Sequence, residues 1–122
     1  MARVLCTGAD PVLLETRRLI LERAGHTVIT AANQVEVVAA CERNGIDVAV
    51  IGHSIPPHIE IRIASLIRSH CPAAKILELY PLHRDRLLTD ADSWMEVPAD
   101  MPEDLAKRVT WLANPRSTRL AG

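Results

Sequence analysis

The run Val48-Ala49-Val50-Ile51-Gly52 constrains the fold of this chain more than any other stretch. It is too short for an independent helix, and Pro56 and Pro57 beyond it are typical of a turn. A strand that is apolar on both faces is covered on both faces, as in a parallel sheet between two layers of helices. Ligands of such sheets bind just beyond the carboxyl ends of the strands, so Gly52 marks the place to look for function.

The rest of the chain alternates strands with helices. Asp10-Pro11 predicts a helix start, and Asn33 with Glu36 has the spacing of a capping box. Besides the run above, strands are expected at 3–7, 27–31, 75–80 and 93–97, and helices at 11–24, 33–45, 58–70, 84–89 and 102–113. This order predicts an α/β, flavodoxin-like, doubly wound sheet of five parallel strands in the order 2-1-3-4-5. Residues 1–115 form the expected domain and 116–122 a tail. In the weakly patterned segment 82–92 we expect a fourth helix that is either shortened to at most two turns or replaced by a loop.

Helical spacing also predicts which side chains face the core. In the first helix Leu13, Thr16, Ile20 and Ala24 are expected to point inward, while Arg17 faces water with the other charged residues. In the third helix two sets remain open, and both of them include Ile67. The first set is Ile59, Ile63 and Ile67, and the offset set is Ile61, Ala64 and Ile67.

Charge and composition narrow the classes of partner. A net charge of -1 gives no general attraction to nucleic acid or to anionic membranes, and no apolar run approaches membrane-spanning length. The scarcity of aromatic residues argues against stacking on single-stranded nucleic acid. Cys6, Cys41 and Cys71 lie in or beside apolar segments without a CxxC pair, so we expect small buried thiols and a cytoplasmic protein.

Several short motifs follow one another along the chain, and their order is informative. They are Arg3-Val4-Leu5 before Asp10-Pro11, Glu22-Arg23-Ala24-Gly25-His26-Thr27-Val28, Asp47-Val48-Ala49-Val50-Ile51 with Pro56 four residues past Gly52, and Val97-Pro98 before the last helix. Together they make the chain resemble a response-regulator receiver domain over residues 3–113. The resemblance implies a role in bacterial two-component signalling. In that family Mg²⁺ is held by an acidic pair, and an aspartate takes a phosphoryl group, whose charge the metal and a lysine offset.

At each of these positions the sequence departs from the family. The acidic pair falls on Gly8 and Ala9, with Asp10 adjacent, and the phospho-acceptor falls on Gly52. The Ser/Thr switch position falls on Tyr80 and the lysine position on Val97. The resemblance further implies that Pro98 follows a cis peptide bond and that Trp94 occupies the position of the switch aromatic residue. A degenerate receiver that is neither phosphorylated nor an enzyme is therefore expected, without metal or cofactor.

Two readings of the tryptophans stay open. Trp94 either contacts the Tyr80 ring, which would lock one arrangement, or fills the edge of the sheet. Trp111 is either a contact anchor or packs at the edge of the core. The expected partner is a signalling protein or a second copy of the chain, bound around Trp94, Lys107 and Trp111.

Two further functions match parts of the sequence. The emptied site around Gly8, Ala9, Gly52 and Val97 could hold a small ligand. Gly52-His53-Ser54 matches the first half of a hydrolase nucleophile elbow, but Pro56 stands where the second glycine belongs. The histidines at 53, 58, 70 and 83 lack the spacing of a zinc site, which favours exposed side chains.

Overall fold

The computed structural model describes residues 2–99 and 101–114. Five parallel strands form one sheet in the order β2-β1-β3-β4-β5, as the sequence predicts. The strands are β1 (Arg3–Thr7), β2 (Thr27–Ala31), β3 (Val48–Ile51), β4 (Lys75–Pro81) and β5 (Ser93–Val97). The helices in the described ranges are α1 (Pro11–Arg23), α2 (Gln34–Arg43), α3 (Pro57–His70) and α4 (Glu103–Ala113). The proposed boundary between domain and tail, at 115/116, lies outside the described residues.

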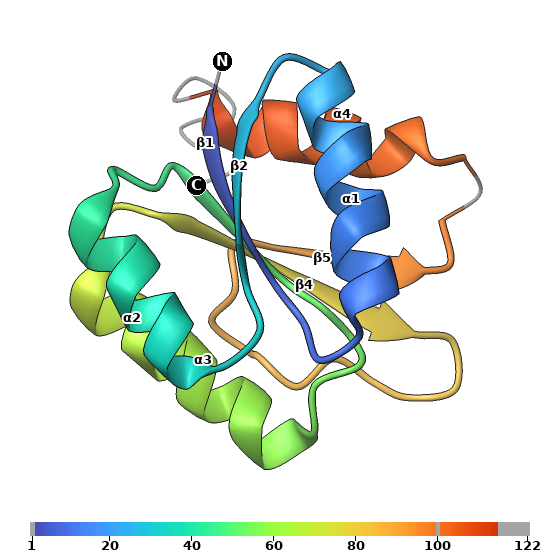
Figure 1. The fold of residues 1–122 in the computed structure, drawn as a ribbon. Coiled ribbons are helices and arrows are strands. Elements are labelled where there is room, and N and C mark those ends of the chain that lie inside the picture. Colours follow the sequence, from blue (N-terminus) through green and yellow to red (C-terminus); the bar gives the residue numbers. More distant parts are fainter. Residues whose placement is uncertain (1, 100, 115–122) are drawn as a thin grey trace.

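The sheet is the middle layer of three, with α1 and α4 on one face and α2 and α3 on the other (Figure 1). All four residues of β3 are buried, which confirms that the apolar run is the covered centre of the sheet. Alternate side chains feed two separate cores: Val48 and Val50 pack toward α1 and α4, while Ala49 and Ile51 pack toward α2 and α3. None of the helices in the described part is long and apolar enough to cross a bilayer.

Capping explains where the first two helices begin. The Asp10 carboxylate accepts hydrogen bonds from the backbone N–H groups of Val12 and Leu13, and Pro11 occupies the first turn. The Asn33 side chain accepts a hydrogen bond from the Glu36 N–H, and Glu36 accepts one in return from the Ala32 N–H. The expected capping box is thus present with its return bond shifted by one residue.

The inward face of α1 differs from the prediction by one residue. The buried residues are Leu14, Arg17 and Leu21, whereas Thr16 and Ala24 are exposed. The two leucines are seven residues apart with Arg17 between them, so the buried stripe of the helix is shifted by about one residue from the expected one. The expectation that Arg17 faces water was therefore wrong.

The first of the two sets proposed for α3 is the better one. Ile63 and Ile67 are buried and Ile59 is partly buried against the core, whereas Ile61 is exposed. Ala64, from the offset set, is also buried. The helix therefore buries a stripe wide enough to take members of both sets.

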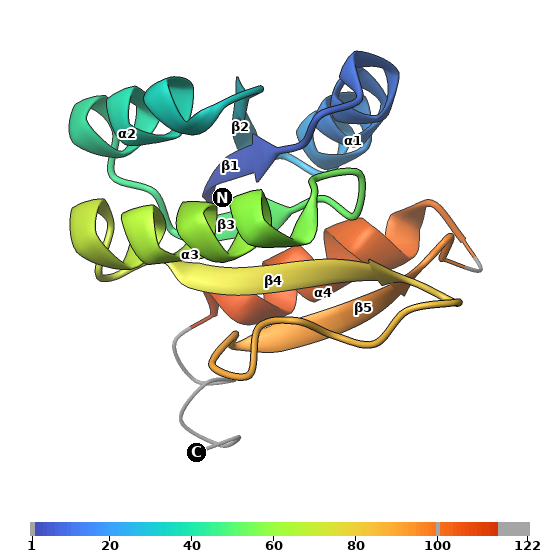
Figure 2. The ribbon, with the colours of Figure 1, turned by 90° about the horizontal axis from the view of Figure 1, so that it is seen from below.

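The shortened fourth helix is absent: the segment 82–92 is a loop that runs back beside β5 (Figure 2). The Glu78 carboxylate accepts hydrogen bonds from the backbone N–H groups of Leu87 (2.9 Å) and Leu88 (3.0 Å). Trp94 donates its indole N–H to the Leu88 carbonyl at 2.8 Å. Because side chains of the sheet satisfy these backbone groups, the loop needs no helical hydrogen bonds.

Cysteine pairing was also predicted wrongly. Cys41 in α2 and Cys71 after α3 form a disulfide with a Cα–Cα distance of 5.5 Å, and Cys6 is a free buried thiol. Lone cysteines 30 residues apart carry no pairing signal in the sequence, and only the packing of α2 against α3 brings these two together.

Candidate functional site

Gly52 lies where the carboxyl ends of β1 and β3 come closest. Its N–H donates to the Thr7 carbonyl at 2.9 Å. A Cβ built on Gly52 would lie 2.9 Å from that carbonyl oxygen and 2.8 Å from Nη1 of Arg17. The space beside Gly52, the position that the resemblance assigns to the phospho-acceptor, is therefore occupied by the cationic side chain of Arg17.

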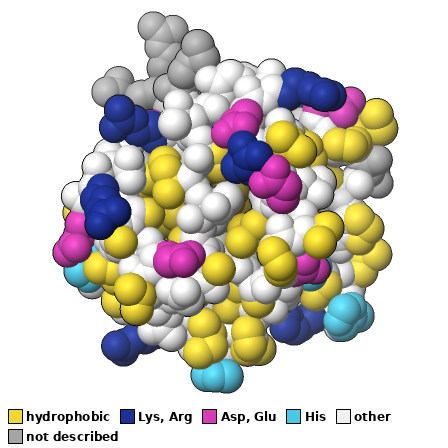
Figure 3. Space-filling view, in the orientation of Figure 1, with side chains coloured by type: hydrophobic (Ala, Val, Ile, Leu, Met, Phe, Trp, Pro, Cys, Tyr) yellow, Lys and Arg dark blue, Asp and Glu magenta, His cyan; other side chains and the backbone are white. Residues whose placement is uncertain are grey.

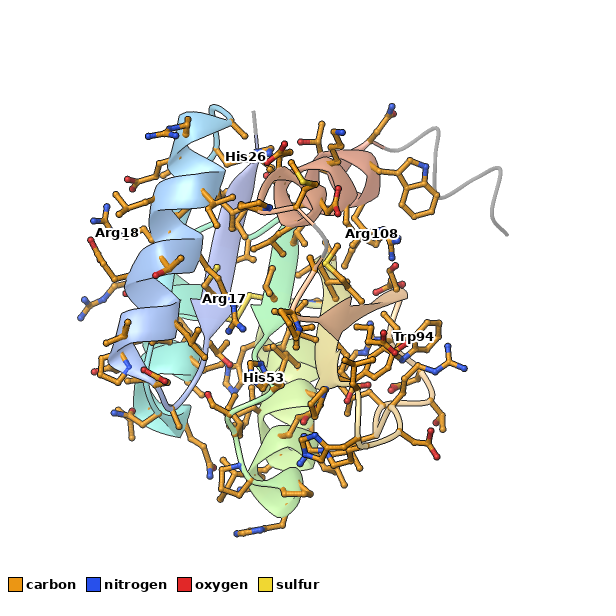
Figure 4. All side chains as sticks on the ribbon, turned by 90° about the vertical axis from the view of Figure 1, so that its right-hand side faces the viewer. Arg17, Arg18, His26, His53, Trp94 and Arg108 are labelled. Atoms are coloured by element: carbon orange, nitrogen blue, oxygen red, sulfur yellow. A yellow bond between two sulfur atoms is a disulfide. The ribbon has the colours of Figure 1, made fainter. Side chains whose placement is uncertain are left out.

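Arg17 reaches this point from α1 (Figure 4). The residue is only 7% exposed, and its Nη2 lies 3.2 Å from Nδ1 of His53. A guanidinium only donates, so His53 accepts through Nδ1 and its own proton is on Nε2. Burial, followed by the charge of Arg17, lowers the pKa of His53 and favours this neutral form.

The charge of Arg17 is poorly compensated. Its Nη1 is buried and has no hydrogen-bond partner among residues 2–99 and 101–114. Burial lowers the pKa of the guanidinium, while the nearby Cys6 and Asp10 raise it. A guanidinium remains charged in proteins, so a cation stands at the tips of the central strands.

The positions that resemble the acidic pair hold the loop together. The Ala9 N–H donates to Ser54 Oγ at 3.2 Å, and Asp10 caps α1. Gly8 adds a backbone hydrogen bond to the Ala31 carbonyl. Within the described ranges, no group of three or more His, Cys, Asp or Glu side chains is placed to hold a metal ion.

The positions at the ends of β4 and β5 face each other. Tyr80 is half-buried and pairs with Glu96, and Pro81 pairs with Val97. The peptide bond between Val97 and Pro98 is cis, which confirms the expectation from the resemblance. Val97 itself packs partly buried against the core between the sheet, α1 and α4.

Trp94 is held by the loop that replaces the fourth helix. The Arg86 guanidinium lies 4.7 Å from the centre of the Trp94 ring, and the indole N–H bonds the Leu88 carbonyl. In the described part of the chain, the Trp94 ring is stacked by Arg86 and does not contact the Tyr80 ring. Trp94 also packs against the core beneath α2 and α3, which agrees with the second reading, a side chain at the edge of the sheet.

The three residues expected to form an interface line two separate hollows. Lys107 and Trp111, on α4, line a hollow of about 420 Å³ together with Glu96. Trp94 lines a separate hollow of about 480 Å³ with Arg86. Trp111 is 41% exposed, so of the two readings the structure favours an accessible ring.

A buried charged cluster escaped the sequence analysis. Glu60 in α3 is fully buried, and neither of its carboxyl oxygens has a hydrogen-bond partner among the described residues. Burial and the neighbouring Glu78 raise its pKa, while Arg84, 4.0 Å away, lowers it. The only hint in the sequence is that Glu60 lies one turn from Ile63 and Ala64 on the inward side of the helix.

No protein-family model and no curated protein sequence matches the chain. Solved structures do. One is a CheY-like response regulator receiver domain protein from Methanospirillum hungatei, with a TM-score of 0.79 and 20% identity over 100% of this chain and 99% of that one. Another is the chemotaxis response regulator CheY4 of Vibrio cholerae, with a TM-score of 0.75 and 23% identity over 92% and 98%.

A third is a response regulator from Burkholderia pseudomallei with a phosphorylated aspartic acid, a calcium ion and citrate. It has a TM-score of 0.75 and 16% identity over 99% of this chain and 71% of that one. These likenesses cover the whole sheet and its helices, while the identity is low throughout. The chain has the fold of response-regulator receiver domains.

Proposed function

We propose that this chain is a receiver-like signalling domain that accepts no phosphoryl group, is not an enzyme, and acts through contacts with other proteins. The fold supports the signalling role, as does the order of motifs along the sequence. The single observation that carries the loss of phosphorylation is at Gly52, where Arg17 Nη1 lies 2.8 Å from the point a Cβ would occupy.

The chemistry of phosphoryl transfer explains why this matters. A receiver needs a carboxylate nucleophile and a divalent cation that offsets the charge of the transferring group. Gly52 has no side chain that could act as a nucleophile, and the carboxylate of Asp10 caps α1. The charge of Arg17 would repel a divalent cation at the same place.

A small phosphodonor tests this proposal directly. The protein is incubated with Mg²⁺ and acetyl phosphate, or with beryllofluoride, and followed by intact mass and tryptophan fluorescence. We expect no phosphoryl adduct and no saturable fluorescence change, beside an active receiver as positive control. An adduct that hydroxylamine removes, as it removes an aspartyl phosphate, would overturn the proposal.

The contact surface that we favour is the exposed part of α4 around Lys107 and Trp111. An exposed indole next to a charged residue is a common anchor at protein interfaces. Val35 in α2 is 78% exposed and lies on the opposite helical layer, so it offers a matched control.

Two measurements address the partner. Sedimentation equilibrium of the wild-type protein and of Trp111→Ala tests whether the partner is a second copy. For a different partner, protein captured from cells is compared between wild type, Trp111→Ala and Val35→Ala. Selective loss with Trp111→Ala is expected, and equal capture by all three would exclude this surface.

We also propose that the domain works in the cytoplasm, where the Cys41–Cys71 pair would be held reduced. Because the three cysteines are buried, free thiols are alkylated during cell lysis in denaturant, and mass analysis then reads this state. Three alkylated cysteines are expected in the cell and one, Cys6, after oxidation in air. One alkylated cysteine in freshly lysed cells would argue for an oxidising compartment.

A second candidate function, small-ligand binding, is favoured by one cavity. The space at Gly52 is not open, because Arg17 Nη1 lies 2.8 Å from the point that a Cβ would occupy. At Gly8 the same point has Leu14 at 3.4 Å and Ser54 at 3.6 Å. Val97, however, lines a cavity of about 390 Å³ that begins at Arg17.

A further inference from the structure

The cavity beside Arg17 lies between α1, α4 and the carboxyl ends of β4 and β5. Its volume of about 390 Å³ is at the lower end of the ~300–1,000 Å³ typical of small-molecule sites. Most of the wall is apolar, from side chains that include Leu13, Ile20, Leu79, Met95, Val97 and Leu105. Arg17 and His53 are the charged and ionisable side chains in this wall.

The state of Arg17 indicates what the cavity lacks. A buried cation without a partner destabilises the fold more than a buried ion pair, because no opposite charge offsets the free energy lost with its hydration. Arg17 is only 7% exposed, and its Nη1 has no acceptor in the described part of the chain. Among the described residues no carboxylate forms an ion pair with Arg17, and the nearby Asp10 caps α1 through its Oδ1.

We propose that this cavity binds a small monocarboxylate with an apolar body, whose carboxylate pairs with the Arg17 guanidinium and whose body lies against the apolar wall. The planar guanidinium matches a carboxylate in charge and in shape. A single positive charge in an apolar wall suits a monoanion better than a phosphate dianion, which needs several donors. Nη1 lies against Gly52, so binding requires the rigid guanidinium to turn as a unit away from Gly52 and toward the cavity, by rotation about the side-chain bonds of Arg17.

His53 holds the guanidinium in the ligand-free arrangement, because its Nδ1 accepts from Arg17 Nη2. When the guanidinium turns, the carboxylate of the ligand replaces this acceptor and supplies the one that Nη1 lacks. The lowered pKa of His53 keeps a second positive charge out of the site near neutral pH. The cavity therefore presents one cation rather than two.

Octanoate is the probe that tests the proposal, with octanol as an apolar control without the carboxylate and inorganic phosphate as an anionic control without the apolar body. Binding is followed by titration calorimetry and by NMR, on the full chain. We expect saturable binding of octanoate, with nuclear Overhauser contacts to Leu105 and Met95, and at least about tenfold weaker binding of octanol and of phosphate. No saturable binding of octanoate at millimolar concentration, or equal binding of octanol, would overturn the proposal.

Substitution of the cation completes the test. Arg17→Met keeps an unbranched, flexible side chain, although a shorter one, and removes the charge, so octanoate affinity should fall by at least about tenfold. Arg18→Met is the matched control, because Arg18 is next in the helix and pairs with Glu15 and Glu22 on the surface. Unchanged octanoate affinity in Arg17→Met would contradict the proposal.

Thr16→Trp provides a second variant whose folding is not in question, since Thr16 is exposed at the rim of the cavity. The indole should obstruct entry and weaken octanoate binding, and unchanged affinity would again contradict the proposed site. The inference deepens the second candidate function and is independent of the phosphodonor experiment. Octanoate binding to a protein that does take a phosphoryl group would refute only the loss of phosphorylation.

Discussion

At the scale of single residues, the close approach of β1 and β3 at Gly52 is the most restrictive feature of the site. The restriction comes from contact rather than from backbone conformation, since Gly25 is the glycine with a positive φ in the described residues. A methyl group at position 52 would meet a backbone carbonyl that cannot move away cheaply.

Gly52→Ala is expected to lower the free energy of unfolding by about 1–3 kcal/mol, because Thr7 or Arg17 must shift. Urea denaturation measures the change. Gly45→Ala is the matched control, since a Cβ there meets nothing within 4 Å, and a neutral or slightly stabilising effect is expected. Equal effects of the two substitutions would contradict the crowding at Gly52.

His26 gives the molecule a pH-dependent contact. Its Nδ1 accepts from the Ala2 N–H at 3.1 Å, so the proton on Nε2 faces the Thr110 hydroxyl at 2.9 Å. Burial lowers the pKa of His26 from 6.5. The unfolded chain therefore binds a proton more readily than the folded one, and stability is lost as pH falls below that value.

We expect the melting temperature to fall as the pH drops below 6.5, with a shallower fall in His26→Gln. Because His26→Gln also removes two hydrogen bonds, it should be less stable than wild type at pH 8, a loss of about 1–3 kcal/mol. His58→Gln, at an exposed position of α3, should keep the wild-type slope. A slope identical in wild type and His26→Gln would contradict this assignment.

At the scale of elements, the loop that replaces a fourth helix depends on one carboxylate. Glu78 faces the loop from β4 and accepts from two consecutive backbone N–H groups, those of Leu87 and Leu88. Arg68 adds ion pairs to Asp90 and Asp92 at 3.6 and 3.7 Å. These exposed pairs contribute less than the buried carboxylate.

Glu78→Gln should therefore lower stability by about 1–3 kcal/mol, because the amide nitrogen meets N–H donors in place of an acceptor oxygen. Hydrogen exchange at Leu87 and Leu88 should accelerate. Asp85→Asn, at an exposed position of the same loop, is the control and should leave exchange at these two residues unchanged. Protection that survives in Glu78→Gln would show that the loop is held by other contacts.

The strands and most helix boundaries could be predicted because each depends on local signals. The apolar run of β3 and the Asp10 cap follow from residue type and order, whereas the cis bond before Pro98 was implied by the resemblance to receiver domains. Arg17 could not be placed in this way, because periodicity assigns charged residues to water unless their neighbours say otherwise. Leu14 and Leu21, seven residues apart, are the sequence signal that fits the observed buried stripe of α1, which includes Arg17. The space that accepts the guanidinium is created by Gly52, far along the sequence.

At the scale of the whole molecule, surface charge follows the balanced composition. Figure 3 shows basic and acidic side chains interspersed with hydrophobic ones over the face it presents. This agrees with the net charge of -1 in offering no extended basic surface on that face. The two helical layers differ instead in covalent chemistry, since the disulfide lies on the side of α2 and α3.

Oxidation of Cys41 and Cys71 should stabilise the molecule by about 3–4 kcal/mol, because it closes a loop of 30 residues in the unfolded chain. Urea denaturation with and without reductant measures the difference. Cys41→Ser should show no such dependence on reductant, and Cys6→Ser should retain it. Equal stability of the oxidised and reduced wild type would contradict the expected effect.

The same bond has a consequence for a chain that has been cut. Everything from the end of α2 to the end of α3, including the whole of β3, lies between Cys41 and Cys71. A protease that severs any one peptide there would leave two fragments joined through sulfur, running as a single band on a gel without reductant. In its oxidised form the molecule could thus lose the continuity of its central strand and still remain one covalent object.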